Sequence, residues 1–167
     1  KVPYNFFREA NSYLDKLDYI SAYIHFYMIL EYCFAEGKFS AEQKKNFRKS
    51  DMLKYAVLST INMIKEQNYN LYLKIQQICT DKHKELNFDS LIDIIYCYRG
   101  ELSHATKRAV YEENQELVKP ITLFISFVCF SVCGNMKVYC KKFVPEETRK
   151  HRVNEHIKRL ELQLGLK

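Results

Sequence analysis

Apolar side chains follow helical spacing in several stretches of the chain. Residues 51–67 place their apolar positions on one face, and Ser50 is the expected cap of this helix. Residues 19–35 are instead apolar on nearly every side, which predicts a helix inside the domain. Asp18 is the expected N-cap of that inner helix, and Gly37 is expected to close it.

The same spacing, together with caps and prolines, predicts helices in five further segments. These are residues 4–14, residues 71–80, a helix capped by Asp89 that stops near Gly100, residues 111–142 with a kink or restart at Pro120, and residues 146–164 after Pro145. We therefore expect an all-α bundle of four or more helices. Residues 1–144 would form the bundle, and residues 145–167 would add a basic amphipathic helix to the same domain.

Length and composition agree with this picture. The 167 residues suit one domain, and 47% hydrophobic against 28% charged residues is typical of a globular protein. Only 4 glycines and 3 prolines are present, too few turn-formers for a sandwich of many short strands. Residues 120–136 carry no charge, but their strongly apolar part, residues 121–133, is shorter than the roughly 20 residues that cross a bilayer. We expect a central buried helix there and no membrane association.

The net charge of +6 is concentrated at one end, because residues 137–167 contain nine Lys and Arg against four Asp and Glu. A basic tail of this kind can bind a phosphate backbone or an acidic partner, or can be a solvated face.

The six cysteines form no CxxC pair, and no signal peptide is visible, so we expect reduced thiols in the cytoplasm. A metal site using Cys129, Cys133 and Cys140 would need a flanking histidine, which is absent, and no cofactor is expected.

Two ionisable residues, His25 and Glu31, lie within the otherwise apolar sequence of the inner helix. His25 is predicted to be a satisfied histidine at the core or its edge, and Glu31 is predicted to pair with a core Arg or Lys rather than to act in catalysis.

The segment YRGELSHAT, residues 98–106, carries the candidate chemistry. Arg99 and His104 lie at the expected end of an apolar helix, where Gly100 can take the left-handed conformation and let His104 fold back toward the guanidinium, or meet its copy across a dimer. In an unbroken helix the two side chains would point roughly 140° apart. Gly-rich phosphate loops and the HExxH and GxSxG motifs are missing from the chain.

This pair suits RNA cleavage without a metal. A histidine titrates near neutrality, so His104 can accept the proton of a 2′-hydroxyl or protonate the leaving 5′-oxygen. Arg99 can hold two phosphate oxygens with its planar fork. Four neighbours are close enough in sequence to position or polarise the phosphate: Tyr98, Glu101, Ser103 and Lys107. The alternative interpretation is that Arg99 and His104 are an ordinary salt-bridge and capping pair at the end of a helix.

YRGELSHAT after an apolar helix, with ITLFISFVCFSVC downstream, resembles the HEPN (higher eukaryotes and prokaryotes nucleotide-binding) superfamily. The run DYISAYIHFYMILEYCF is similar to the opening helix of its ApeA-like bacterial members, which carries a glutamate near its end. Only the Arg-x4-His element is a sharp motif.

The resemblance implies a helical bundle, usually dimeric, that cleaves RNA and leaves a 2′,3′-cyclic or 3′-phosphate and a 5′-hydroxyl. It further implies that Arg99 binds phosphate, that His104 is the acid/base, and that the domain belongs to a toxin or phage-defence protein, with possible further domains or an antitoxin. Thr106 stands where one regulated subgroup has a tyrosine. The runner-up hypothesis is a non-catalytic module that dimerises or binds RNA or protein through the basic tail.

Overall fold

The computed structural model describes residues 2–38, 40–139 and 146–165, and every regular element within them is helical. This confirms the all-α prediction. The elements in chain order are α1 (Val2–Asp15), α2 (Tyr19–Phe34), α3 (Ser40–Lys49), α4 (Asp51–Gln67), α5 (Tyr69–Asp81), α6 (Phe88–Ser103), α7 (Ala105–Glu113), the 3₁₀ turn η1 (Gln115–Leu117), α8 (Lys119–Tyr139) and α9 (Glu146–Leu164).

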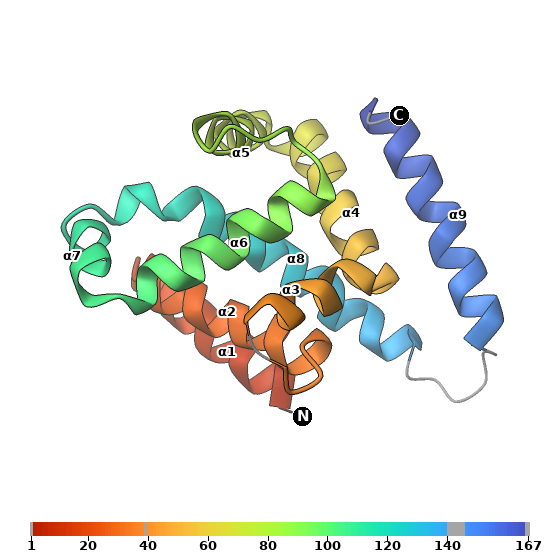
Figure 1. The fold of residues 1–167 in the computed structure, drawn as a ribbon, viewed down its shortest axis with the longest axis horizontal. Helices are drawn as coiled ribbons and strands as arrows, with labels where there is room; N and C mark the ends of the chain where they lie inside the picture. The colour runs from red at the N-terminus through yellow and green to blue at the C-terminus, as the bar shows by residue number, and fades with distance from the viewer. Residues whose placement is uncertain (1, 39, 140–145, 166–167) are drawn as a thin grey trace.

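Helices α2 and α8 form the centre of the bundle and run in the same direction (Figure 1). The hydroxyl of Thr122 donates to the carbonyl of Tyr19 at 3.0 Å, and further along both helices the thiol of Cys129 donates to the carbonyl of Phe26 at 3.3 Å. These four residues are fully or nearly fully buried. Polar groups so deep in a core must be paired with one another, and here the pairs fix the register of the two helices.

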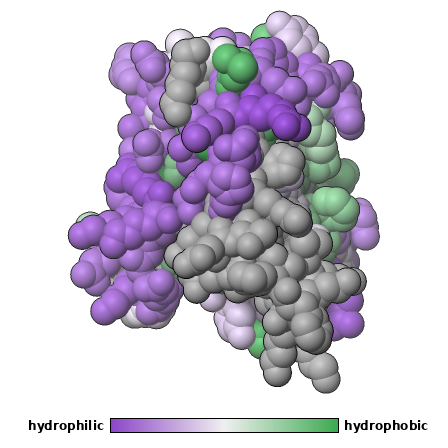
Figure 2. Space-filling model, turned by 90° about the vertical axis from the view of Figure 1, so that its right-hand side faces the viewer, coloured by the Kyte–Doolittle hydropathy of each residue, from purple (hydrophilic) through white to green (hydrophobic). Residues whose placement is uncertain are grey.

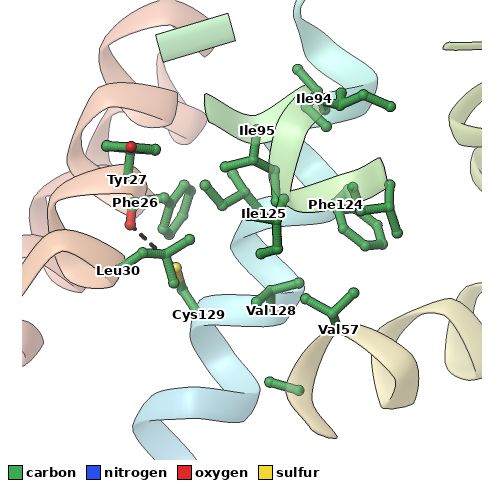
Figure 3. Packing of buried hydrophobic residues seen from close by; sticks show 14 of the residues in the cluster. Phe26, Tyr27, Leu30, Val57, Ile94, Ile95, Phe124, Ile125, Val128 and Cys129 are labelled. Atoms are coloured by element: carbon green, nitrogen blue, oxygen red, sulfur yellow. Dashed lines mark hydrogen bonds between the residues drawn. The ribbon is translucent and has the colours of Figure 1, made fainter. Parts of the chain in front are cut away.

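The other helices cover this centre. Helix α1 packs along α2, α4 crosses α8, and α6 runs across the front of α2 in Figure 1. Figure 3 shows side chains of α2, α4, α6 and α8 meeting in one apolar cluster. Phe124 and Ile125 of α8 are both fully buried, and burial of side chains of this size stabilises the fold by about 1.5–3 kcal/mol each. The predicted central buried helix is therefore present, and none of the described helices has the length and apolar character of a membrane-crossing segment.

Helix α9 packs against α4 at the right of Figure 1. Ile157 is 5% exposed, and Lys54 Nζ lies 2.9 Å from Oε1 of the buried Glu161. The face of the molecule that includes α9 is mainly hydrophilic where it is coloured in Figure 2. The described part of the basic tail is thus an amphipathic helix with an inner apolar side, as predicted, while the side chains of Arg149 and His156 lie outside the described residues.

Helix α3 was not predicted. Its sequence, SAEQKKNFRK, is polar apart from an alanine and Phe47, so it lacks an apolar stripe. Phe47 is nevertheless fully buried and packs edge-on against the ring of Tyr27 at 6.1 Å. One buried aromatic ring is enough to hold this helix on α2, and a single position carries no periodicity that a sequence could display.

Of the two possibilities predicted at Pro120, a kink or a restart, the structure has a restart, and the start predicted at residue 111 is wrong because α7 already begins at Ala105. Helix α7 ends at Glu113, and α8 begins at Lys119, so Pro120 lies in the first turn of a new helix, where its missing N–H costs nothing. Between them, Gln115 leaves the helical path and its Oε1 accepts from the backbone N–H of Tyr19 at 2.9 Å. The break therefore supplies a cap to α2. The end predicted at residue 142 lies outside the described residues.

The N-caps predicted for α2 and α4 are confirmed, because Asp18 accepts from the N–H of Ser21 and Ser50 accepts from that of Leu53. At the other end of α2 the C-cap is Ala35, and Gly37, the predicted closing residue, lies two residues beyond it with a positive φ of 68°. For α6 the prediction was wrong. Asn87, not Asp89, is the N-cap, since its side chain accepts from the N–H of Ser90 at 2.9 Å. Starting the helix one residue after Asn87 allows Phe88 to be buried at 6% exposure, a tertiary effect that decided between two capping residues on either side of Phe88.

Candidate functional site

The break between α6 and α7 lies at His104, not at Gly100. Helix α6 continues through Gly100 to Ser103, and His104 alone takes an extended conformation (φ −96°, ψ 120°) before α7 begins. Gly100 has no positive φ. The helix continues because Leu102, at 1% exposure, gains burial by staying on it, and this outweighs the roughly 1 kcal/mol that a helical glycine costs.

A half-buried network holds α7 against the end of α6. The hydroxyl of Tyr111 on α7 donates to Oε2 of Glu101 on α6 at 2.5 Å, and Lys82 Nζ lies 3.2 Å from Oε1. Burial alone would raise the pKa of Glu101. The hydrogen bonds from Tyr111 and Cys97 and the charge of Lys82 have the larger effect, so the pKa of Glu101 is lower than usual. Glu101 therefore stays ionised and fixes the angle at which the chain turns at His104.

Arg99 projects from α6 into solvent and is held from two sides. Its Nη1 donates to Oγ of Ser103 at 3.3 Å, and Ser103 in turn donates to the Arg99 carbonyl at 2.8 Å. On the other side, Arg99 Nε lies 4.0 Å from Oε1 of Glu31 on α2. The side chain of Arg99 remains 46% exposed. The guanidinium is thus oriented yet open to a ligand.

Glu31 joins two further helices to this site. It accepts a hydrogen bond from Gln43 Nε2 of α3 at 2.9 Å, while its other contact is Arg99 of α6. The predicted pairing of Glu31 with a basic residue is confirmed, although the partner is half exposed rather than in the core. Glu31 and Gln43 also border an open pocket of about 360 Å³, so solvent reaches the carboxylate.

Tyr27 lies one helical turn before Glu31 and is buried at 1% exposure. Its hydroxyl has no hydrogen-bond partner among the described residues. Burial, and then the negative charge of Glu31, raise the pKa of this phenol, so it stays neutral. An unpaired buried hydroxyl costs about 1–3 kcal/mol, which marks this place next to the Arg99–Glu31 pair as a local weak point of the core.

His104 and Lys107 are exposed, and neither side chain makes a hydrogen bond or ion pair with the described part of the chain. The alternative of a helix-end bridging and capping pair is not supported, because the His104 side chain caps nothing and Arg99 contacts Glu31 and Ser103 instead. The imidazole of His104 is therefore accessible to a substrate.

Tyr98 does not face the site. It is 7% exposed, its ring lies 6.3 Å from Tyr23 and 5.9 Å from Tyr111, and Lys82 Nζ lies 5.1 Å from the ring centroid. Burial, followed by the charge of Glu101, raises the pKa of Tyr98 to about 12. The suggestion that Tyr98 polarises a phosphate is corrected: it packs the helix junction from inside.

His25 matches the prediction of a satisfied edge histidine. Its Nδ1 contacts the Ser21 carbonyl at 2.8 Å, and its Nε2 lies 3.5 Å from Glu9. Cys129 and Cys133 are buried thiols, and Cys140 lies outside the described residues. In the part of the chain that the structure covers, no three His, Cys, Asp or Glu side chains gather as metal ligands would.

Sequence reasoning missed a second charged group near this site. Three cations from two segments, Lys44 and Arg48 of α3 and Lys84 before α6, meet one carboxylate, that of Asp93 on α6. The basic run KKNFRK of α3 was the available signal, but the tail drew attention because its charge surplus is larger.

Comparison with known proteins adds no further information. No family model, curated protein or solved structure matches this chain. The HEPN resemblance therefore stays a prediction, and the functional argument depends on the geometry around Arg99 and His104.

Proposed function

We propose that this domain is a metal-independent endoribonuclease in which Arg99 binds the scissile phosphate and His104 transfers the proton. The observation that carries the proposal is the exposure of both side chains at one helix junction, with Arg99 oriented by Glu31 and Ser103 and His104 without a side-chain partner. Arg99 keeps 46% of its side-chain surface exposed in spite of these two contacts, so both groups leave polar atoms accessible to a ligand.

The chemistry needs no cofactor. His104 takes the proton of a 2′-hydroxyl, the 2′-oxygen bonds to phosphorus, and the bond from phosphorus to the 5′-oxygen breaks. A proton then reaches the leaving 5′-oxygen, from the imidazole of a second chain or from water. Arg99 stabilises the negative charge that develops on the phosphate oxygens. The products are a 2′,3′-cyclic phosphate and a 5′-hydroxyl.

We also propose that the working form is a homodimer, so that two copies of the Arg99 and His104 pair face one cleft, as the HEPN resemblance implies. Toxin or phage-defence activity in the cytoplasm, with an antitoxin or further domains, belongs to the same proposal. In α7 the exposed Lys107 lies three residues after His104, which places one further cation near the junction, whereas Arg108 is paired with Glu112 at 2.7 Å.

The test is RNA cleavage by the wild-type protein in EDTA, compared with His104→Ala and Arg99→Ala. We expect His104→Ala to reduce cleavage by at least 10²-fold without changing helical content, since general acid/base groups contribute about 10²–10⁴ in rate. Ser12→Ala is a matched control, because Ser12 is exposed on α1. Full activity in His104→Ala would contradict the proposal.

A non-catalytic module that binds RNA or protein through the basic tail is the second candidate. Lys158 and Arg159 of α9 are exposed, which favours a binding role for the outer face of this helix. In that case binding depends on the tail and on salt, and His104→Ala has no effect.

A further inference from the structure

Four charged side chains form a compact group, here named the Asp93 cluster: Lys44, Arg48, Lys84 and Asp93. Arg48 Nη2 lies 2.6 Å from Asp93 Oδ1, Lys44 Nζ lies 3.4 Å from the same oxygen, and Lys84 Nζ lies 3.1 Å from Oδ2. The three cations keep 31–37% of their side-chain surface exposed, whereas Asp93 is 24% exposed. Solvent therefore reaches the cations more easily than the carboxylate.

The cations of the cluster outnumber the carboxylates that they contact. One carboxylate faces three cations, and among the described residues the only further acid in contact is Asp89, whose Oδ1 lies 3.4 Å from Arg48 Nε. Burial alone would raise the pKa of Asp93. The Lys84 hydrogen bond and the charges of Arg48 and Lys44 have the larger effect, so the pKa of Asp93 is lower than usual. Next to the cluster, Lys45 and Lys49 of α3 are exposed and have no ion pair within the described residues.

The cluster continues the surface that holds Arg99. Asp93, Tyr96 and Arg99 follow one another along α6 at steps of three residues, which place Asp93 about 9 Å from Arg99 along the helix axis and turn the two side chains about 120° apart around it. Lys44 Nζ lies 5.2 Å from the ring centroid of Tyr96, between the two positions. The residue before Lys44 is Gln43, which contacts Glu31 beside Arg99. Helix α3, which packs against α6 (Figure 1), therefore contacts both the Asp93 cluster, through Lys44 and Arg48, and the candidate site, through Gln43.

We infer that the Asp93 cluster binds the backbone phosphates of an RNA strand whose scissile phosphate lies at Arg99, and that Asp93 occupies the phosphate position in the free protein. The inference rests on the proposed function. Each nucleotide of an RNA strand carries one phosphate charge, so a strand bound at Arg99 has neighbouring phosphates that a second group of cations can bind. Arg48 and Lys44 now hold Oδ1 of Asp93 and Lys84 holds Oδ2, and the same three donors suit the oxygens of a phosphate.

Binding of a labelled single-stranded RNA oligonucleotide of mixed sequence tests this inference, in the His104→Ala background so that the probe stays intact. The test variant is Lys44→Gln/Arg48→Gln. We expect its affinity to fall about 10-fold or more and its salt dependence, log K against log [salt], to become shallower by about 1.4, or 0.7 per phosphate contact for a single strand. Thermal unfolding is measured in parallel.

The matched control is Lys65→Gln/Lys74→Gln, which removes the same charge from exposed positions of α4 and α5. Helix α5 lies at the top of Figure 1, apart from α3. We expect this control to keep the salt slope within a few tenths of the parent value. An equal loss in both double variants would show that only overall charge matters, and would contradict the inference.

A second variant, Asp93→Asn, keeps every cation and removes the internal competitor. We expect it to bind the same RNA several-fold more tightly, which a purely structural cluster would not produce. This result stands even if Lys44→Gln/Arg48→Gln fails to fold. Unchanged or weaker RNA binding by a folded Asp93→Asn protein overturns the inference, and so does preferential binding of polyglutamate over RNA.

The outcomes separate the two proposals. RNA cleavage by the wild type together with unchanged binding in the cluster variants refutes the Asp93 cluster but leaves the nuclease intact. Cluster-dependent RNA binding without any cleavage supports the cluster as a phosphate surface and refutes the nuclease. If the protein neither binds nor cleaves RNA, both proposals are refuted.

Discussion

Arg99 Nε on α6 lies 4.0 Å from Glu31 Oε1 on α2, and this contact joins the inner helix of the bundle to its exposed junction. At this distance, with Arg99 46% exposed and Glu31 30% exposed, the pair orients the guanidinium more than it stabilises the fold. A ligand phosphate can replace the carboxylate as the partner of Arg99, because a mobile ligand can approach the guanidinium to hydrogen-bond distance whereas Glu31 stays at 4.0 Å.

Glu31→Gln tests that orienting role. We expect the variant to cleave RNA with a kcat lowered several-fold, because Arg99 loses the charge that holds it, while KM does not rise, because a negative charge beside the phosphate is removed. Steady-state kinetics measure both constants. Glu42→Gln is the matched control, since Glu42 is exposed on α3 and contacts Lys38 at 3.9 Å rather than Arg99. A higher KM with an unchanged kcat would contradict the orienting role.

Gly100→Ala tests the position of the helix break. Gly100 is helical, and a Cβ placed there meets no atom within 4 Å. We therefore expect the alanine variant to be more stable by about 0.4–1 kcal/mol, because alanine loses less backbone entropy in a helix. Urea unfolding measures the change. A loss of more than 1 kcal/mol would mean that Gly100 needs the left-handed conformation that the sequence suggested.

The contrast between Gly100 and the confirmed caps shows what the sequence could predict. Asp18 and Ser50 act within a few residues of their own position, so local rules identified them. At Gly100 the local rule failed, because the burial of Leu102 determined where α6 ends. Likewise, Gln115 breaks its helix in order to cap α2, a partner that is distant in the sequence.

In the candidate site, too, the sequence predicted local features but not contacts between distant segments. The sequence identified Arg99, His104 and the need of Glu31 for a basic partner. It could not identify that partner, because the contact depends on how α2 crosses α6. The Asp93 cluster was missed for the same reason, since its cations come from α3 and from the segment before α6.

Tyr27 and Tyr23 make a matched pair for the core. The Tyr23 hydroxyl donates to the Ile95 carbonyl, whereas that of Tyr27 has no partner within the described residues. We expect Tyr23→Phe to cost about 0.5–1.5 kcal/mol and Tyr27→Phe to be neutral or stabilising. Chemical unfolding of both variants measures the difference. Equal losses in the two variants would show that the Tyr27 hydroxyl is paired, and would contradict this part of the account.

Glu101 predicts how stability depends on acid. Its pKa is lowered in the folded state, so its contribution is fully present above the ordinary glutamate pKa of about 4.3 and is lost as the pH falls through the folded value. We expect Glu101→Gln to flatten the decline in melting temperature below pH 5, and Tyr111→Phe to reduce it in part by removing one hydrogen bond. Differential scanning calorimetry across this range measures both. An acid decline as steep as that of the wild type in Glu101→Gln would contradict the assignment.

Identification of the RNA ends produced by the wild-type protein in EDTA tests the central claim most directly. Mass spectrometry of a cleaved oligonucleotide should show a 2′,3′-cyclic phosphate or 3′-phosphate and a 5′-hydroxyl, and a single 2′-deoxy substitution at the cleaved position should block the reaction. Ends with a 3′-hydroxyl and 5′-phosphate, cleavage of the deoxy substrate, or no cleavage at all would contradict the assignment of Arg99 and His104 as the site of phosphate binding and proton transfer.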